Sequence, residues 1–121
     1  MSETFTHPLC LALRERALSL PEVSEGASCV NRAFKARKKN FLFLGEKPDE
    51  IRVMVELGPS LGEVEQRAQD DPRIQVGKHG WLTLRCALDA PLPTELLRGW
   101  VEESYRLVAP KTLVRQLDAG G

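Results

Sequence analysis

Two stretches of the chain alternate between apolar and polar residues, which is the pattern of strands that bury one face. The apolar positions are Ile51, Val53, Val55 and Leu57 in the first stretch and Leu82, Leu84 and Cys86 in the second. Residues 41–44 are apolar throughout and indicate a central strand, and residues 29–37 before them form the first arm of a hairpin. With a brief strand at 73–76, the pattern predicts an antiparallel sheet of about five strands.

Helical spacing predicts a helix before these strands. Apolar residues recur every three or four positions from Leu9 to Leu20, after a helix start at Thr6. Residues 21–28 have turn-forming composition and little periodicity, which is typical of a loop.

Two more helical regions are predicted later in the chain. Ser60 and Glu63 have the spacing of a capping box for a short helix that ends near Asp70. The clearest apolar stripe consists of Leu97, Trp100, Val101, Ser104 and Val108, and one or two further turns follow Pro110. The predicted order is α-β-β-β-α-β-β-α-α, an α+β domain whose antiparallel sheet is packed by N- and C-terminal helices.

The length of 121 residues is that of one domain, and we expect residues 1–6 and 118–121 to be frayed tails. No apolar run approaches the ~20 residues of a membrane span, and the N-terminus lacks the basic region of a signal peptide. We therefore expect a cytoplasmic protein, and a monomer. The three cysteines have no C-x-x-C spacing and predict reduced thiols, with neither a disulfide nor a cofactor required.

Charge is balanced over the whole chain but not along it. Basic and acidic residues number 17 each, and the pI near 6.7 is unlike that of a strongly cationic nucleic-acid binder. Residues 32–39 nevertheless hold five cations and no acid, whereas residues 49–71 hold seven acids against Arg52 and Arg67. The sequence therefore predicts a polarised molecule.

Four strings of residues carry a family resemblance that extends from about Leu9 to Leu117. They are Leu20–Val23, Phe34–Phe41, His79–Leu82 and, as the most specific, Trp100–Lys111 with Glu-Ser-Tyr at its centre. In these strings the chain resembles the MmcQ/YjbR family of small bacterial proteins. The resemblance implies a double-wing α+β fold similar to frataxin-like proteins, a DNA-binding role and no catalytic residues. The chain departs from the family pattern in having Cys29-Val30-Asn31 where a Trp-Gly precedes the first strand.

The candidate DNA contacts lie on two basic hairpins, because strands and the turn between them can present cations to phosphates. They are Arg32, Lys35, Arg37, Lys38, Lys39, Lys78, His79, Trp81 and Arg85. The alternative for the first hairpin is a solvated tip whose lysines discourage pairing between sheet edges.

The second hairpin contains Gly77-Lys78-His79-Gly80, which matches the G-x-x-G of a KH nucleic-acid clamp. A KH loop joins two helices, whereas this turn leads into a strand, so the match is weak. Trp81 and Arg85 share one strand face, where they would stack on bases or enter a minor groove if exposed. The alternative is that the C-terminal helix covers Trp81.

Catalysis has few candidates, since only His7 and His79 could act as a base near neutral pH. Cys29 with His79 is a conceivable nucleophile and base, but the cysteines suit core positions. The acids Glu63, Glu65, Asp70 and Asp71 could attract a hard cation, although a solvated helix face explains them better. For Ser104, on the apolar stripe, we predict a bond to a backbone carbonyl or a buried partner.

The sequence thus favours a non-enzymatic domain that holds the phosphate backbone of double-stranded DNA with little base readout. The alternative is an interaction module that binds a protein or a small anion on the same basic face. Zero net charge favours the alternative, whereas the paired hairpins favour DNA.

Overall fold

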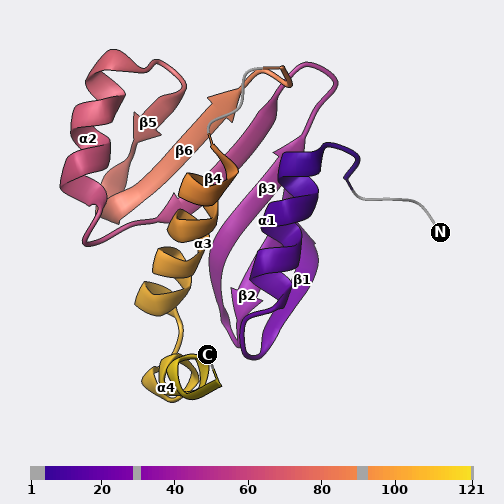
Figure 1. Ribbon diagram of the computed structural model, residues 1–121, viewed down its shortest axis with the longest axis vertical. Helices are drawn as coiled ribbons and strands as arrows, with labels where there is room; N and C mark the ends of the chain where they lie inside the picture. Colours follow the sequence, from indigo (N-terminus) through magenta and orange to yellow (C-terminus); the bar gives the residue numbers. More distant parts are fainter. Residues whose placement is uncertain (1–4, 29–30, 90–92, 121) are drawn as a thin grey trace.

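The computed structural model describes residues 5–28, 31–89 and 93–120, which form one antiparallel sheet and the helices around it (Figure 1). The strands are β1 (Val23–Ser28), β2 (Asn31–Ala36), β3 (Lys39–Glu46), β4 (Ile51–Glu56), β5 (Ile74–Val76) and β6 (Trp81–Cys86), in the spatial order β1-β2-β3-β4-β6-β5. The helices are α1 (Pro8–Leu18), α2 (Leu61–Asp70), α3 (Thr94–Val108) and α4 (Lys111–Gly120), with a single 3₁₀ turn, η1 (Lys78–Gly80). The predicted α+β class and the order of the helices among the strands are confirmed.

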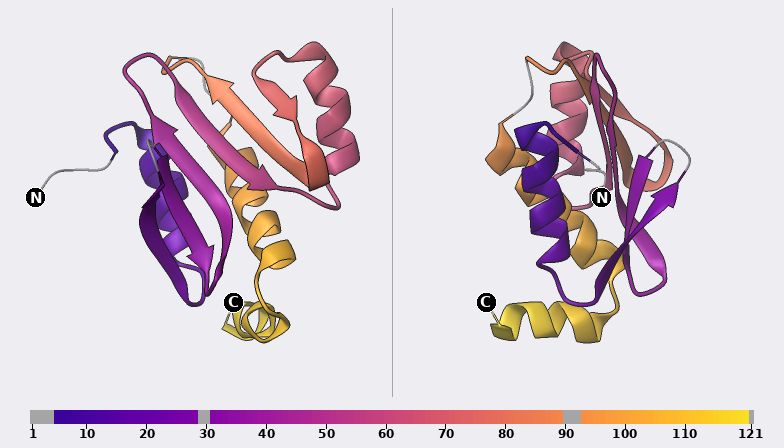
Figure 2. Two further views of the ribbon diagram at one scale, coloured as in Figure 1. Left: turned by 180° about the vertical axis from the view of Figure 1, so that it is seen from behind. Right: turned by 90° about the vertical axis from the view of Figure 1, so that its right-hand side faces the viewer.

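One face of the sheet is covered by helices and the other is open. Helices α1 and α3 lie side by side on the first face, and strands β2, β3, β4 and β6 lie uncovered in the reverse view (Figure 2). The alternating strands bury the predicted residues, since Ile51, Val53, Val55, Leu82 and Leu84 are all at most 1% exposed. Burial of this apolar face against α1 and α3 is the main favourable term in folding.

The sheet has six strands because residues 23–28, which we predicted as a loop, form the edge strand β1. Backbone pairing with β2 runs from Val23 opposite Ala36 to Ser28 opposite Asn31. The polar Glu25 lies on the helix side of β1, where it accepts from Arg14 of α1. Because an acid occupies an inward position, the segment lacks the apolar alternation that would have identified it as a strand.

The predicted cap of α1 is wrong, and the predicted cap of α2 is right in position but lacks its side-chain hydrogen bond. Helix α1 is capped by His7, whose Nδ1 accepts from the Leu9 N–H at 3.1 Å, while Thr6 bonds to Glu46. Ser60 makes no side-chain cap bond to α2, because its hydroxyl donates to Glu103 of α3 at 2.6 Å. In both cases a distant acid binds the side chain that the local sequence assigned to a cap.

Among the described residues that we expected to belong to frayed tails, Phe5, Thr6 and Asp118 make contacts within the fold. Phe5 is 4% exposed, and the backbone N–H groups of Thr6 and His7 both donate to Glu46. Asp118 accepts from Arg106 at 2.7 Å.

Gly80 occupies a position that only glycine fits. Its φ of +81° is in the left-handed region, and a Cβ there would lie 2.6 Å from the Leu57 carbonyl oxygen. We predict that Gly80→Ala lowers the free energy of unfolding by about 2–3 kcal/mol in urea titrations. Gly62→Ala in α2 is the control, since nothing lies within 4 Å of its added Cβ and no loss is expected. Equal stability of the two variants would contradict this account of the turn.

Glu46 gives the fold a testable pH dependence. Partial burial acts to raise its pKa, but hydrogen bonds from Thr6 and His7 outweigh burial and hold the pKa below the usual 4.5. A lowered pKa stabilises the fold above pH 4.5, and this contribution is lost as the pH falls through the lowered value. We predict that Glu46→Gln lowers the urea midpoint at pH 7 and that the deficit shrinks in strong acid. A deficit that stays constant with pH would contradict this role of the carboxylate.

Candidate nucleic-acid interface

Three consecutive residues of α3 tie together the end of the sheet at which the basic turns lie. Ser104, fully buried, donates to the Phe41 carbonyl of β3 at 2.6 Å and accepts from the Glu56 N–H of β4 at 2.9 Å. This confirms the predicted role of Ser104. The two bonds fix the start of β3 and the end of β4 under α3.

The neighbours of Ser104 extend this anchor in two directions. Glu103 accepts from the backbone N–H groups of Gly58 and Ser60, at 2.9 and 3.0 Å, in the loop before α2. Tyr105 donates its hydroxyl to the Pro21 carbonyl at 2.7 Å, and its ring meets that of Phe41 edge to face. The Glu-Ser-Tyr centre of the most specific string is therefore a structural anchor.

The two basic turns lie at the same end of the sheet. Leu42 pairs with Val55 and Val55 with Leu82, so β3 begins, β4 ends and β6 begins at the same end of the sheet. The β2–β3 turn and the β5–β6 turn both lie at this end of the sheet, each at the lower end of its strands in Figure 1. We call this end of the sheet the basic end. Its two turns and the residues that flank them carry Arg37, Lys38, Lys39 and Lys78, with His79 next to Lys78.

The cations of the first hairpin are not equivalent. Arg32 lies away from the tip and pairs with Glu25 on the helix side, at 2.8 Å. Arg37, with a left-handed φ of 60° at the tip, pairs with Glu22, and that side-chain hydrogen bond lowers the pKa of the carboxyl. Lys38 and Lys39 are exposed and form no salt bridge with any residue that the structure describes. The lysines are thus the cations most available to a ligand.

The predicted contact residues on the open face of the sheet lie at different distances from the basic end along their strands. Trp81 is half-buried and packs on Phe43, with ring centroids 5.9 Å apart, while α3 lies on the opposite face. Lys35 is exposed near the basic end, but Arg85 is four residues along β6 from Trp81. The structure therefore does not bring Arg85 to the basic end.

Arg85 has basic neighbours that the sequence analysis missed. It lies directly opposite Arg52 on β4, and its backbone N–H donates to the Arg73 carbonyl at 2.8 Å. Arg52 pairs with Glu50 and Arg73 with Asp71. Alternation places Arg52 and Arg85 on outward positions, but only the strand register shows that they are adjacent.

The Gly77–Gly80 turn is not a KH clamp. It joins β5 to β6 through η1, and His79 has a left-handed φ of 59°. The Leu57 N–H donates to the Gly80 carbonyl at 2.9 Å, so this glycine lets the turn approach the end of β4. Lys78 and His79 both lie in this turn and are exposed.

No catalytic arrangement is found in the described part of the chain. Cys10 and Cys86 are buried, and burial, followed by the charge of Glu46, raises the pKa of Cys10 to about 12. The other thiol considered, Cys29, lies outside the described residues, as does Val30. The searched residues contain no group of three or more His, Cys, Asp or Glu side chains that could hold a metal ion. No described helix is long and apolar enough to cross a membrane.

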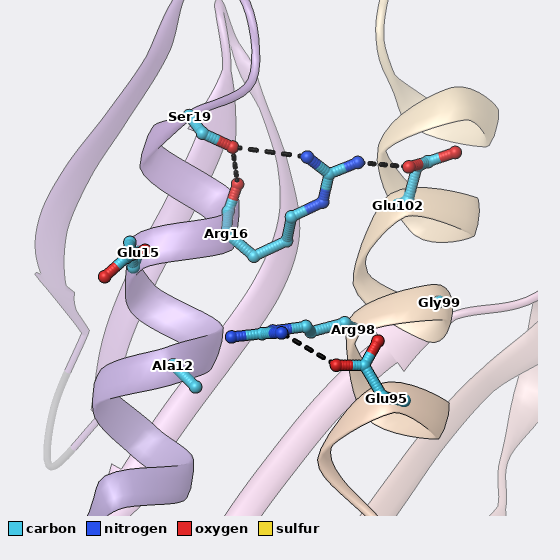
Figure 3. A pocket seen from close by; sticks show the side chains of 8 residues that line it. All are labelled: Ala12, Glu15, Arg16, Ser19, Glu95, Arg98, Gly99 and Glu102. Atoms are coloured by element: carbon cyan, nitrogen blue, oxygen red, sulfur yellow. Dashed lines mark hydrogen bonds and ion pairs between the residues drawn. The ribbon is translucent and has the colours of Figure 1, made fainter.

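A groove between α1 and α3 has internally paired charges (Figure 3). Arg16 reaches from α1 to Glu102, and Arg98 pairs with Glu95 on its own helix at 2.8 Å. The volume of about 550 Å³ is large enough for a ligand, but each of these cations already contacts an acid. None of the predicted DNA contacts lines it.

Fold and site together define a small α+β domain with an open sheet face and two basic turns at one end. The chain belongs to the YjbR family, whose model matches residues 18–107. Its structure is similar to the crystal structure of Deinococcus radiodurans protein DR2400, a DUF419 domain, with a TM-score of 0.63. The two share 24% sequence identity over 88% of this chain and 85% of that chain, which shows a common fold. No curated protein matches the sequence.

The anchor role of Ser104 can be tested by Ser104→Ala. The substitution leaves the Glu56 N–H and the Phe41 carbonyl without their partner, so we expect a loss of about 2–3 kcal/mol in unfolding free energy. Ser24→Ala, exposed on β1, is the control and should change stability by less than about 0.5 kcal/mol. Urea unfolding followed by tryptophan fluorescence measures both. A Ser104→Ala variant as stable as the control would contradict the anchoring role of Ser104.

Proposed function

We propose that this protein is a DNA-binding domain that contacts the phosphate backbone with the two turns of its basic end. The observation that carries the proposal is the placement of the lysines. Five of the six in the sequence gather around this end, namely Lys35, Lys38, Lys39, Lys78 and Lys111, and only Lys47 lies at the opposite end of the sheet. Such clustering gives a neutral chain a local cationic surface of the kind that phosphates attract.

The spacing of the two turns suits a duplex. Their centres are three strand spacings apart, or about 14 Å in a regular sheet, because β4 lies between the two hairpins. The major groove of B-DNA is about 12 Å wide, so Lys38 and Lys78 could contact phosphates on its two borders. Helix α4 contributes only Lys111 and Arg115, so the turns supply most of the positive charge at this end, which favours backbone contact with little sequence preference.

Fluorescence anisotropy with a labelled duplex at several salt concentrations tests the proposal. About four phosphate contacts predict a log–log salt slope of about −4. The double variant Lys38→Glu with Lys39→Glu should weaken binding and lower the slope by about 2, and Lys78→Glu should lower it by about 1.

Lys47→Glu is the matched control, since it makes the same charge change at the opposite end of the sheet. It should leave affinity within about twofold, because a distance beyond the Debye length of ~10 Å screens its charge. The proposal fails if the wild-type protein does not bind the duplex at low salt, or if Lys47→Glu weakens binding as much as Lys78→Glu.

A further inference from the structure

A second feature of the basic end is a hollow between the β2–β3 turn and the junction of α3 and α4. Its volume is about 540 Å³, within the range of small-ligand sites. Arg37, Lys38 and Lys39 line it from the turn, and Lys111 lines it from the first residue of α4. The remaining wall is uncharged and comes from residues 107–110 with Ala36.

The charges of this hollow are unbalanced. Its lining residues include four cations and no acid, whereas the groove between α1 and α3 has Glu15, Glu95 and Glu102 beside its two arginines. Glu22 partly offsets the excess by pairing with Arg37, but the three lysines form no salt bridge with any described residue. The hollow therefore suits an anion.

The uncharged wall gives the hollow an apolar side. Leu107 is 44% exposed and is one of the few large apolar residues of the described chain that remain so accessible. It is followed by Val108, Ala109 and Pro110, which continue the apolar surface to the start of α4. An inorganic anion would leave this surface in water, so a ligand with an apolar body fits better.

The identity of the cations favours phosphate over carboxylate as the head group. The guanidinium of Arg37, the group whose planar fork matches a carboxylate, is already held by both oxygens of Glu22, each at 3.1 Å. The ammonium groups of Lys38, Lys39 and Lys111 are point charges, which suit the several oxygens of a phosphate dianion.

We propose that this hollow binds a small phosphate monoester with an apolar tail, its head among the three lysines and its tail along Leu107–Pro110. The site goes beyond the proposed DNA contact: it shares Lys38 and Lys39 with that contact but uses Leu107 and does not use Lys78.

The test is a titration of ¹⁵N-labelled full-length protein with octyl phosphate below its micelle concentration, followed by amide chemical shifts. Saturable shifts are expected at residues 38, 39 and 107–111. Inorganic phosphate and 1-octanol, which carry the head or the tail alone, should bind at least about tenfold more weakly because each leaves one wall uncontacted. Octanoate should bind less tightly than octyl phosphate. Equal affinity for inorganic phosphate and octyl phosphate, or shifts confined to other regions, would overturn the proposal.

Two variants separate this site from the DNA contact. Leu107→Ser, at a solvent-accessible helix position, should weaken octyl phosphate about tenfold and leave duplex affinity unchanged. Lys78→Glu should do the reverse. If Leu107→Ser fails to fold, the wild-type comparison of octyl phosphate with its head and tail alone still decides the matter. Octyl phosphate binding is measured without DNA, so either proposal can fail while the other stands.

Discussion

The hydroxyl of Ser104 makes the contact on which the arrangement of the basic end depends. Successive residues of a helix point about 100° apart, so Glu103, Ser104 and Tyr105 face three different directions. They bind the loop before α2, the two central strands and the turn before β1, respectively. A single helical turn thus holds the starts of β1, β3 and α2 and the end of β4, and so positions the β2–β3 turn. The backbone bond from Leu57 to Gly80 ties the β5–β6 turn to the end of β4.

Much of the sheet could be predicted because its central strands follow one simple rule. In β4 and β6 the inward positions are apolar without exception, so alternation identifies both strands and the face that each buries. The rule fails at β1, where Glu25 faces inward to reach Arg14. Local sequence also mispredicts the hydrogen bonds at the caps of α1 and α2, because Glu46 and Glu103 lie some 40 residues away from the groups they bind. Pairings at that separation leave no local pattern.

The candidate site shows the same division between local and distant information. The cluster at residues 35–39 is visible in the sequence, but its proximity to Lys78 depends on the strand order, in which β4 separates the two hairpins. The proximity of Lys111 depends on the break at Pro110 that redirects α4 beneath the β2–β3 turn (Figure 1). The net charge of zero therefore does not reveal that five of the six lysines are gathered at one end of the sheet.

Arginine and lysine take different roles in this fold, and the difference explains how a neutral chain exposes a basic surface. Every salt bridge found in residues 5–28, 31–89 and 93–120 uses an arginine, as expected for a planar group that binds carboxylates through two parallel bonds. These pairs occupy acids such as Glu22, Glu25 and Glu102 with structural contacts, so their charge is neutralised within the fold. Lys38, Lys39, Lys78 and Lys111 are exposed at the basic end and form no salt bridge in the described part of the chain. Net charge is thus a poor guide to ligand preference when one type of cation stabilises the fold and the other remains exposed to solvent.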